Sequence, residues 1–271
     1  MTETTEPTLE QDEQTVKEES CQKCEKQLRV VMGLLNSLHD GLIGDGTFTY
    51  GGGGENDKHS VQLLYLYRSF NSVRCSYELV QLGYYTQAIS LLRSALEDLL
   101  VCQRCKKDSA LVKRLLEGQE ERFNFAAMAK AEGGKFADWW QKSYHDLSLF
   151  VHPTPLGLRI LLSPEDRRVR LGPYFDQQEL IGVIYYHLVI LIRVLGLLAP
   201  ILDSMNAYPG WGQPTLERIK GANRLIEEIV EELDPEGRLA MKEALSAPEE
   251  KSGSWEEYKQ QRAARVRDQK G

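Results

Sequence analysis

An almost uninterrupted apolar run from Leu180 to Leu202 is the feature that most constrains the fold of this chain. The run is long enough to cross a bilayer as a helix, and a helix buried at the centre of a bundle has the same character. It contains His187 and Arg193, and an arginine near the middle of a membrane span is costly. We therefore expect a buried central helix and no membrane contact, and a membrane-associated protein is the less favoured alternative.

The rest of the chain repeats apolar residues at helical spacing between glycine and proline breaks, which predicts an all-α bundle of five or six helices. Asp176 is a suitable N-cap for the central helix, and Gly118 is a position where an earlier helix is expected to bend. The helices expected before the central one cover about 18–42, 58–82, 85–107, 109–131 and 135–151.

Three segments are expected to depart from this bundle, which covers 18–203. Residues 1–17 are rich in Thr, Glu and Gln and are expected to be an acidic, disordered N-terminus. Two short alternating apolar runs near 158–171 flank a proline turn and predict a small β-hairpin inserted before the last long helix. Residues 204–271 are strongly charged and are expected to form a helical C-terminal appendage that could bind a protein partner.

The charge balance limits the classes of partner. The formal net charge of −7 argues against a general nucleic-acid coat but allows a local basic patch. Such a patch could contact RNA phosphates, or it could be a solvated hairpin edge, since Glu165 and Asp166 lie within it. It lies on the predicted hairpin and consists of Arg159, Arg167, Arg168 and Arg170.

Five cysteines, an odd number without a dense framework, favour a reducing cytoplasm, and the acidic N-terminus does not resemble a secretory signal. The pairs Cys21–Cys24 and Cys102–Cys105 could together form a four-thiolate zinc site. The long interval between the pairs exceeds the usual spacing, and the second pair lies inside a predicted helix. We therefore expect buried structural cysteines and neither a metal nor another cofactor.

A polar cluster is predicted where two of the helices would meet. His145, Ser148 and His152 occupy positions i, i+3 and i+7 of one helix, which Pro153 then ends. Arg93 and Glu97 are one turn apart on an earlier helix. If these helices pack together, their polar side chains and Tyr144 form a cluster in an otherwise apolar bundle.

These two segments carry a family resemblance. The sequence from Leu91 to Glu97 contains R-x-x-x-E, and the sequence from Tyr144 to His152 reads Y-x-x-L-S-x-x-x-H. Together with the Gly-Pro-Tyr step that begins at Gly172, they resemble a group of helical bacterial proteins of the HEPN-like (higher eukaryotes and prokaryotes nucleotide-binding) family, which is related to abortive-infection proteins. The resemblance covers roughly residues 60–203 and implies a HEPN-like helical bundle.

The resemblance also implies an activity. Many HEPN proteins are metal-independent ribonucleases that act as homodimers in phage defence or stress responses, with an Arg, a polar residue and a His in their motif. Here His145 and Asp146 occupy the positions of the Arg and the polar residue, and His152 is the motif histidine. His152 would transfer a proton at an RNA 2′-hydroxyl, Arg93 would hold a phosphate, and Glu97 would orient them.

Two other interpretations of the cluster remain open. It could bind RNA or a nucleotide without cleaving it, or it could be a buried polar network in a non-catalytic scaffold, with Arg93 paired to Glu97 and with Ser148 and His152 satisfying each other. The absence of an arginine shortly before His152 favours the non-catalytic interpretations, whereas the aligned stripe on the same helix favours catalysis.

Overall fold

The computed structural model describes residues 8–43, 55–119, 122–151, 172–204 and 211–233. In these ranges the regular structure is entirely helical, with eight helices and no strand, so the all-α class is confirmed. The β-hairpin expected near 158–171 lies outside the described residues. The helices are α1 (Leu9–Ile43), α2 (Glu55–Gln81), α3 (Tyr85–Cys105), α4 (Ser109–Leu116), α5 (Phe125–Glu132), α6 (Gly134–Val151), α8 (Gln177–Ser204) and α9 (Gly212–Leu233).

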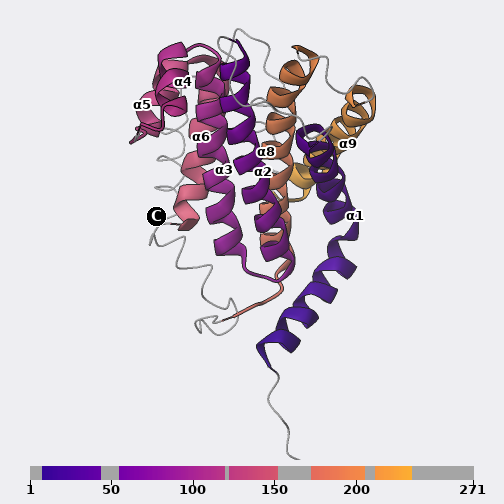
Figure 1. Cartoon of the computed structure of the whole chain (residues 1–271). Coiled ribbons are helices and arrows are strands. Elements are labelled where there is room, and N and C mark those ends of the chain that lie inside the picture. Colours follow the sequence, from indigo (N-terminus) through magenta and orange to yellow (C-terminus); the bar gives the residue numbers. More distant parts are fainter. Residues whose placement is uncertain (1–7, 44–54, 120–121, 152–171, 205–210, 234–271) are drawn as a thin grey trace, which may run out of the picture.

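Helix α8 lies at the centre of the bundle and packs against α1, α2, α3 and α9 (Figure 1). It begins where the sequence predicts, because the Asp176 carboxylate accepts a hydrogen bond from the Glu179 N–H at 3.0 Å. Among the described helices it is the one that is long and apolar enough to cross a membrane by length and composition, and 67% of its apolar window is buried inside the bundle. Packing in the core therefore accounts for the apolar run.

The one histidine of α8 is part of this core. His187 is fully buried, its Nδ1 lies 2.9 Å from the Val183 carbonyl oxygen, and its ring meets Tyr77 edge-on. Burial lowers the pKa of His187 to about 4, so the imidazole is neutral near pH 7 and Nδ1 carries the proton that Val183 accepts. His187 therefore has a structural role.

Helices α2 and α3 form an antiparallel pair with a heptad seam. Side chains of α2 donate hydrogen bonds to backbone carbonyls of α3 at intervals of seven residues on both helices. Small residues at two of the three levels, Ser69 with Ala95 and Ser76 with Ala88, let the two backbones approach closely. Leucine and valine one turn away fill the space between the helices. The three bonds are Gln62 to Cys102 at 3.2 Å, Ser69 to Ala95 at 3.4 Å and Ser76 to Ala88 at 2.8 Å.

The turn between α2 and α3 requires a glycine. Gly83 has a φ of +80°, and a Cβ atom added there would lie 2.1 Å from the Tyr174 carbonyl oxygen. Tyr174 belongs to the segment that leads into α8, and its ring packs edge-on against Tyr85 at the start of α3. Gly83 therefore allows both the tight turn and the close contact between this turn and the segment before α8.

The N-terminal helix is longer than the sequence predicts. We expected disorder over 1–17, but α1 begins at Leu9, and its first half extends beyond the end of the bundle (Figure 1). Val16 is buried in this half, and Glu13 accepts a hydrogen bond from Tyr84 at 2.7 Å. These contacts with the end of the α2–α3 pair hold a segment whose composition alone indicates disorder. Residues 1–7 lie outside the described residues.

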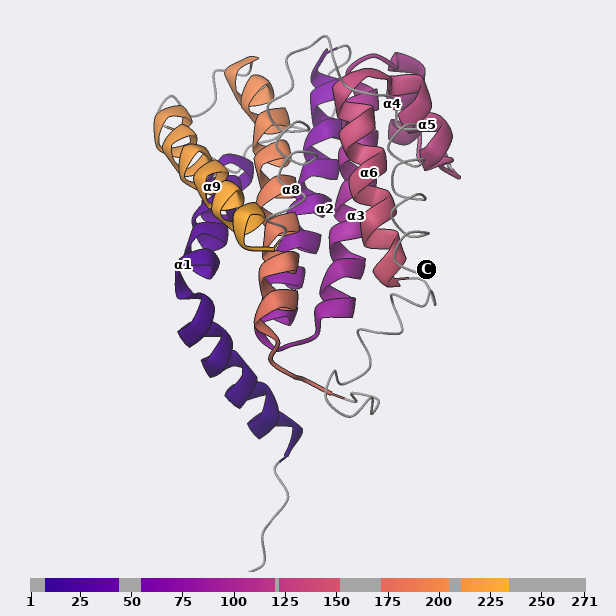
Figure 2. The ribbon, with the colours of Figure 1, turned by 180° about the vertical axis from the view of Figure 1, so that it is seen from behind.

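Helix α9 belongs to the same core as the other helices. We assigned residues from 204 onward to a separate appendage, but the apolar face of α9 packs on α1 and α8 (Figure 2). Just before α9, the Trp211 indole donates a hydrogen bond to the Ser37 carbonyl at 2.7 Å, against Gly41. The bundle therefore extends to Leu233, and the rest of the expected appendage lies outside the described residues.

The helix expected over 109–131 is two helices. Asp108 caps α4 by accepting the Leu111 N–H at 2.9 Å, and Asn124 caps α5 by accepting the Ala127 N–H at 3.0 Å. Gly118 has a φ of +67°, which ends the first helix where we expected only a bend. The two short helices cover one end of α3.

The α2–α3 seam should not tolerate a larger side chain. Replacing buried Ala95 with leucine forces the helices apart and should reduce the free energy of unfolding by about 1–3 kcal/mol. Ser94→Leu places the same side chain at the exposed neighbouring position and should cost less than about 1 kcal/mol. Urea unfolding of both variants measures this, and equal losses would contradict a close-packed seam.

Asp98 makes stability depend on pH. Burial raises the pKa of this carboxyl to about 6, against the pull of Arg68 at 3.4 Å, so protonation favours the folded state. The stabilisation from this proton is complete below the unfolded pKa of 3.8 and is lost as the pH rises through about 6. The free energy of unfolding of Asp98→Asn, relative to that of the native chain, should therefore increase by about 1 kcal/mol when the pH is raised from 5 to 7.5. Urea unfolding of both proteins at the two pH values measures this change. A difference between the proteins that does not vary with pH would contradict the role of Asp98.

Candidate functional site

Helices α3 and α6 pack antiparallel and bring the predicted polar segments together. The Trp140 indole donates a hydrogen bond to the Leu96 carbonyl at 2.6 Å, and its ring stacks on Tyr144 with centroids 4.6 Å apart. Trp140 is 1% exposed, so it fixes the position of α6 on α3. One turn further along α6, Tyr144 faces Arg93 and Glu97, which lie one turn apart on α3.

These three residues form one hydrogen-bonded unit, which we call the Arg–Tyr–Glu cluster (Arg93, Tyr144 and Glu97). Arg93 Nη2 donates to the Tyr144 hydroxyl at 2.5 Å, and this hydroxyl donates to Glu97 Oε1 at 3.0 Å. Arg93 Nε lies 3.7 Å from the same carboxylate oxygen, and the guanidinium carbon lies 4.7 Å from the centre of the Tyr144 ring. The sequence prediction that the two segments meet is confirmed for these residues.

The cluster lies at the edge of the core, where it is accessible to a ligand. The Arg93 and Glu97 side chains are 22% and 27% exposed. Burial raises the pKa of the Tyr144 phenol, against the hydrogen bond from Arg93, so the phenol keeps its proton near neutral pH. The cluster can therefore orient a cationic fork at a half-buried position, which is an arrangement suited to a phosphate.

Ser148 and Asp146 of α6 make hydrogen bonds to groups other than Arg93. The Ser148 hydroxyl donates to the Tyr144 carbonyl of its own helix at 2.6 Å, and His145 is exposed. Asp146 is half-buried and accepts a hydrogen bond from the Tyr186 hydroxyl of α8 at 3.5 Å. Two of the proposed catalytic residues therefore lie outside the Arg–Tyr–Glu cluster, although they are on the same helix.

The remaining candidates lie outside the described residues. These are His152, which directly follows the last residue of α6, and the four arginines of the expected hairpin, Arg159, Arg167, Arg168 and Arg170. The described part of α6 ends at Val151, seven residues or about 10 Å beyond Tyr144. Because α6 runs antiparallel to α3, this end lies toward the start of α3.

A contact between α6 and α8 was not predicted from the sequence. The guanidinium of Arg193 lies 5.0 Å from the centre of the Trp139 ring. The neighbouring Trp140 contacts α3, so the two adjacent tryptophans join α6 to two different helices. The interruption of an apolar run by one arginine was the only signal for this contact, and it did not indicate the partner.

The two cysteine pairs lie at opposite ends of α2. Cys21 Sγ is 4.0 Å from Gln81 Oε1, whereas Cys102 accepts its hydrogen bond from Gln62 through its carbonyl oxygen. The two glutamines are nineteen residues apart on α2, or about 28 Å. The alternative of a four-thiolate zinc site is therefore wrong, and the described residues contain no cluster of three side chains that could hold a metal ion. Burial raises the pKa of Cys24 to about 11, as expected of a structural thiol.

Comparisons with protein-family models, with curated proteins and with solved structures found no match to this chain. The HEPN-like resemblance therefore depends on the sequence motifs alone.

The Arg–Tyr–Glu cluster should show energetic coupling. Tyr144→Phe removes the bridging hydroxyl and should reduce the free energy of unfolding by about 0.5–1.5 kcal/mol. Tyr67→Phe, at a 44% exposed position on α2, should have almost no effect. In a double-mutant cycle with Glu97→Gln, the effects should differ from additivity by at least about 0.5 kcal/mol. Additive effects in urea unfolding would show that the hydroxyl does not join the two helices.

Proposed function

We propose that this chain is a HEPN-like effector that binds RNA or a nucleotide where α3 and α6 meet. The observation that carries this proposal is the Arg–Tyr–Glu cluster. It joins the R-x-x-x-E segment and the tyrosine of the Y-x-x-L-S-x-x-x-H segment through two hydrogen bonds. In this proposal Arg93 binds a phosphate, and Tyr144 and Glu97 hold its guanidinium in a fixed orientation.

Cleavage of the RNA is the catalytic form of the same proposal. His152, one residue beyond α6, would take the proton from a 2′-hydroxyl, and the hydroxyl would attack the adjacent phosphate without a metal ion. Exposed His145 could supply positive charge when protonated, and Asp146 would stabilise that charge. By the resemblance, the active form would be a cytoplasmic homodimer in phage defence or a stress response.

A non-catalytic scaffold is the second candidate, and one observation favours it. The Arg93 guanidinium is already engaged by the Tyr144 hydroxyl, by the Tyr144 ring and by Glu97. Contacts of this kind can hold α6 on α3 without a ligand. This candidate predicts that loss of Arg93 changes stability but not the affinity for RNA.

Two variants should distinguish RNA binding from RNA cleavage. Labelled single-stranded RNA, titrated with protein in EDTA, should bind the native chain, and Arg93→Gln should weaken binding by at least about tenfold, the loss expected for a charge-assisted hydrogen bond. His152→Ala should keep the affinity and abolish any cleavage. Fluorescence polarisation measures the binding, and gel electrophoresis of the same samples detects the cleavage.

Arg29→Gln is the matched control. Arg29 pairs with Glu25 one turn away on α1, as Arg93 pairs with Glu97, but its side chain is 77% exposed. Helices α1 and α6 lie on opposite sides of the bundle (Figure 1). Equal affinity in the two arginine variants would contradict the proposal and leave the scaffold as the explanation. Binding without cleavage in every protein would retain the binding function and exclude the nuclease under these conditions.

A further inference from the structure

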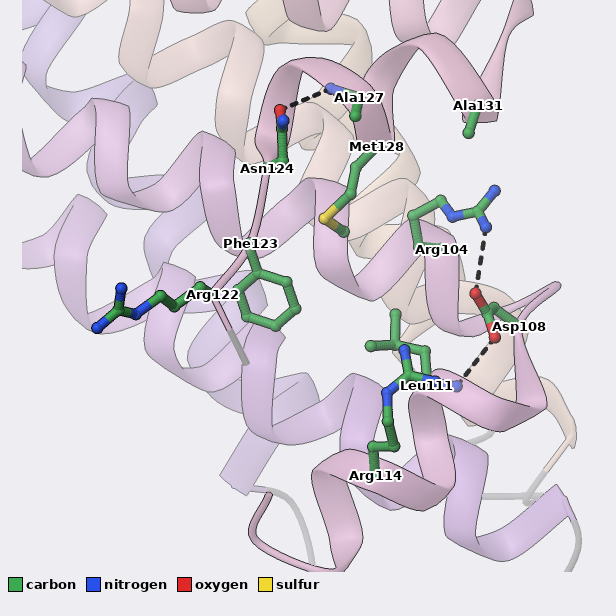
Figure 3. A pocket seen from close by; sticks show the side chains of 10 residues that line it. All are labelled: Arg104, Asp108, Leu111, Arg114, Arg122, Phe123, Asn124, Ala127, Met128 and Ala131. Atoms are coloured by element: carbon green, nitrogen blue, oxygen red, sulfur yellow. Dashed lines mark hydrogen bonds and ion pairs between the residues drawn. The ribbon is translucent and has the colours of Figure 1, made fainter. Parts of the chain in front are cut away.

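A pocket lies where the ends of α3, α4 and α5 meet, but its charged side chains do not converge on a common point (Figure 3). Arg104 is paired with Asp108, which also caps α4, and the side chain of Arg122 points away from the pocket (Figure 3). These contacts join the ends of three helices, and the lining does not select a ligand. A clearer signal lies on the face of α8 that the bundle leaves uncovered.

Packing in the core leaves one stripe of α8 partly exposed. Helix α8 lies on α1, α2 and α3, and Figure 2 shows its outer face between α9 and α6. The residues of this face recur at the three- and four-residue spacing of a single helix face. We call it the α8 stripe, and it consists of Gly182, Tyr185, Tyr186, Ile192, Arg193 and Gly196.

The α8 stripe has the composition of a protein interface. Its larger side chains are two tyrosines, an isoleucine and an arginine, and aromatic residues and arginine are enriched at the centres of interfaces. Trp139 of α6 extends the stripe, because the centre of its ring lies 5.0 Å from the Arg193 guanidinium. The rings of Tyr185 and Tyr186 meet edge-on with centroids 5.2 Å apart, so neighbouring side chains hold the aromatic part in place.

The two glycines of the stripe are not required by the packing of a single chain. A Cβ atom added at Gly182 or Gly196 would meet no other atom within 4 Å. Both residues lie inside α8, where a glycine weakens the helix. They are two heptads apart, so they lie on the same face and leave space in which the side chains of another molecule can approach the α8 backbone.

The charges beside the stripe differ between its two halves. In the part of the chain that the structure describes, Arg193 contacts the Trp139 ring and forms no ion pair. In the other half, the Asp146 carboxylate lies 3.5 Å from the Tyr186 hydroxyl. Two antiparallel stripes would place Arg193 of each chain near the tyrosines and Asp146 of the other, whereas parallel stripes would bring like charges together. The stripe is therefore complementary to itself in the antiparallel orientation.

We propose that two copies of this chain associate through the α8 stripe, with their α8 helices antiparallel across a two-fold axis. The tyrosines of each copy pack over Gly196 of the other, and Arg193 lies near the Asp146 carboxylate of the other copy. Both copies use the same surface, so the assembly closes as a dimer. The surface follows from the contacts of this chain, and the proposal does not depend on RNA binding at the Arg–Tyr–Glu cluster.

Sedimentation equilibrium of the full chain tests the proposal by measuring the Kd of the dimer, with the native chain expected to dimerise below about 100 μM. Gly196→Leu fills the space over the α8 backbone and should raise this Kd by at least about tenfold. Arg193→Glu places a negative charge near Asp146 of the other copy and should have an effect of similar size. Circular dichroism should show that both variants keep the native helix content.

Gly33→Leu and Arg74→Glu are the matched controls, and both should keep the native Kd. A Cβ atom added at Gly33, inside α1, also meets no other atom within 4 Å, and Arg74 is exposed on α2.

A monomer at about 100 μM would overturn the proposal and leave the stripe to be covered by another molecule. A dimer that Gly196→Leu and Arg193→Glu do not weaken more than the controls would also overturn it, because the contact would then lie elsewhere. A dimer that both variants weaken, in a chain that does not bind RNA, would support this inference and contradict only the proposed function.

Discussion

The close contact between α2 and α3 is the constraint on which the rest of the structure depends. Three side chains of α2, spaced by seven residues, donate hydrogen bonds to three carbonyls of α3 with the same spacing. Such a ladder fixes the register of the pair and requires small residues between the two backbones. With α2 and α3 fixed, Gly83 sets the contact with the segment before α8, and α8 then supports α1 and α9. The opposite side of α3 remains available for α5 and α6.

The Arg–Tyr–Glu cluster occupies that side of α3. Trp140 fixes α6 through a buried hydrogen bond to the Leu96 carbonyl, and this contact places Tyr144 between Arg93 and Glu97. Toward the other end of α3, Asp108 and Glu132 hold Arg104 in place through ion pairs. Arg93 and Arg104 are therefore about 16 Å apart on one rigid helix, and each is held in place by acidic partners.

The sequence predicted the fold where a segment carries its own signals. The boundaries of α2, α3 and α6, and the cap at Asp176, follow from helical spacing and from glycine, proline and aspartate positions. It failed where tertiary contacts decide. Residues 9–17 of α1 carry too few apolar residues to be recognised alone, and α9 was expected as a helix but not as part of the core. The meeting of Arg93, Glu97 and Tyr144 was predictable from two motifs. The ion pair of Arg104 with Glu132 was not, because no local pattern indicates that α5 packs on the end of α3.

The central functional claim is that RNA lies along α3 and α6 at the Arg–Tyr–Glu cluster. Photocrosslinking of the full chain to single-stranded RNA containing 4-thiouridine, followed by mass spectrometry of the crosslinked peptides, tests it most directly. Crosslinks should fall on the first half of α3 and the second half of α6, and Arg93→Gln should remove them. Crosslinks confined to other helices, or an unchanged pattern in Arg93→Gln, would contradict the claim and leave the cluster as a structural clamp between α3 and α6.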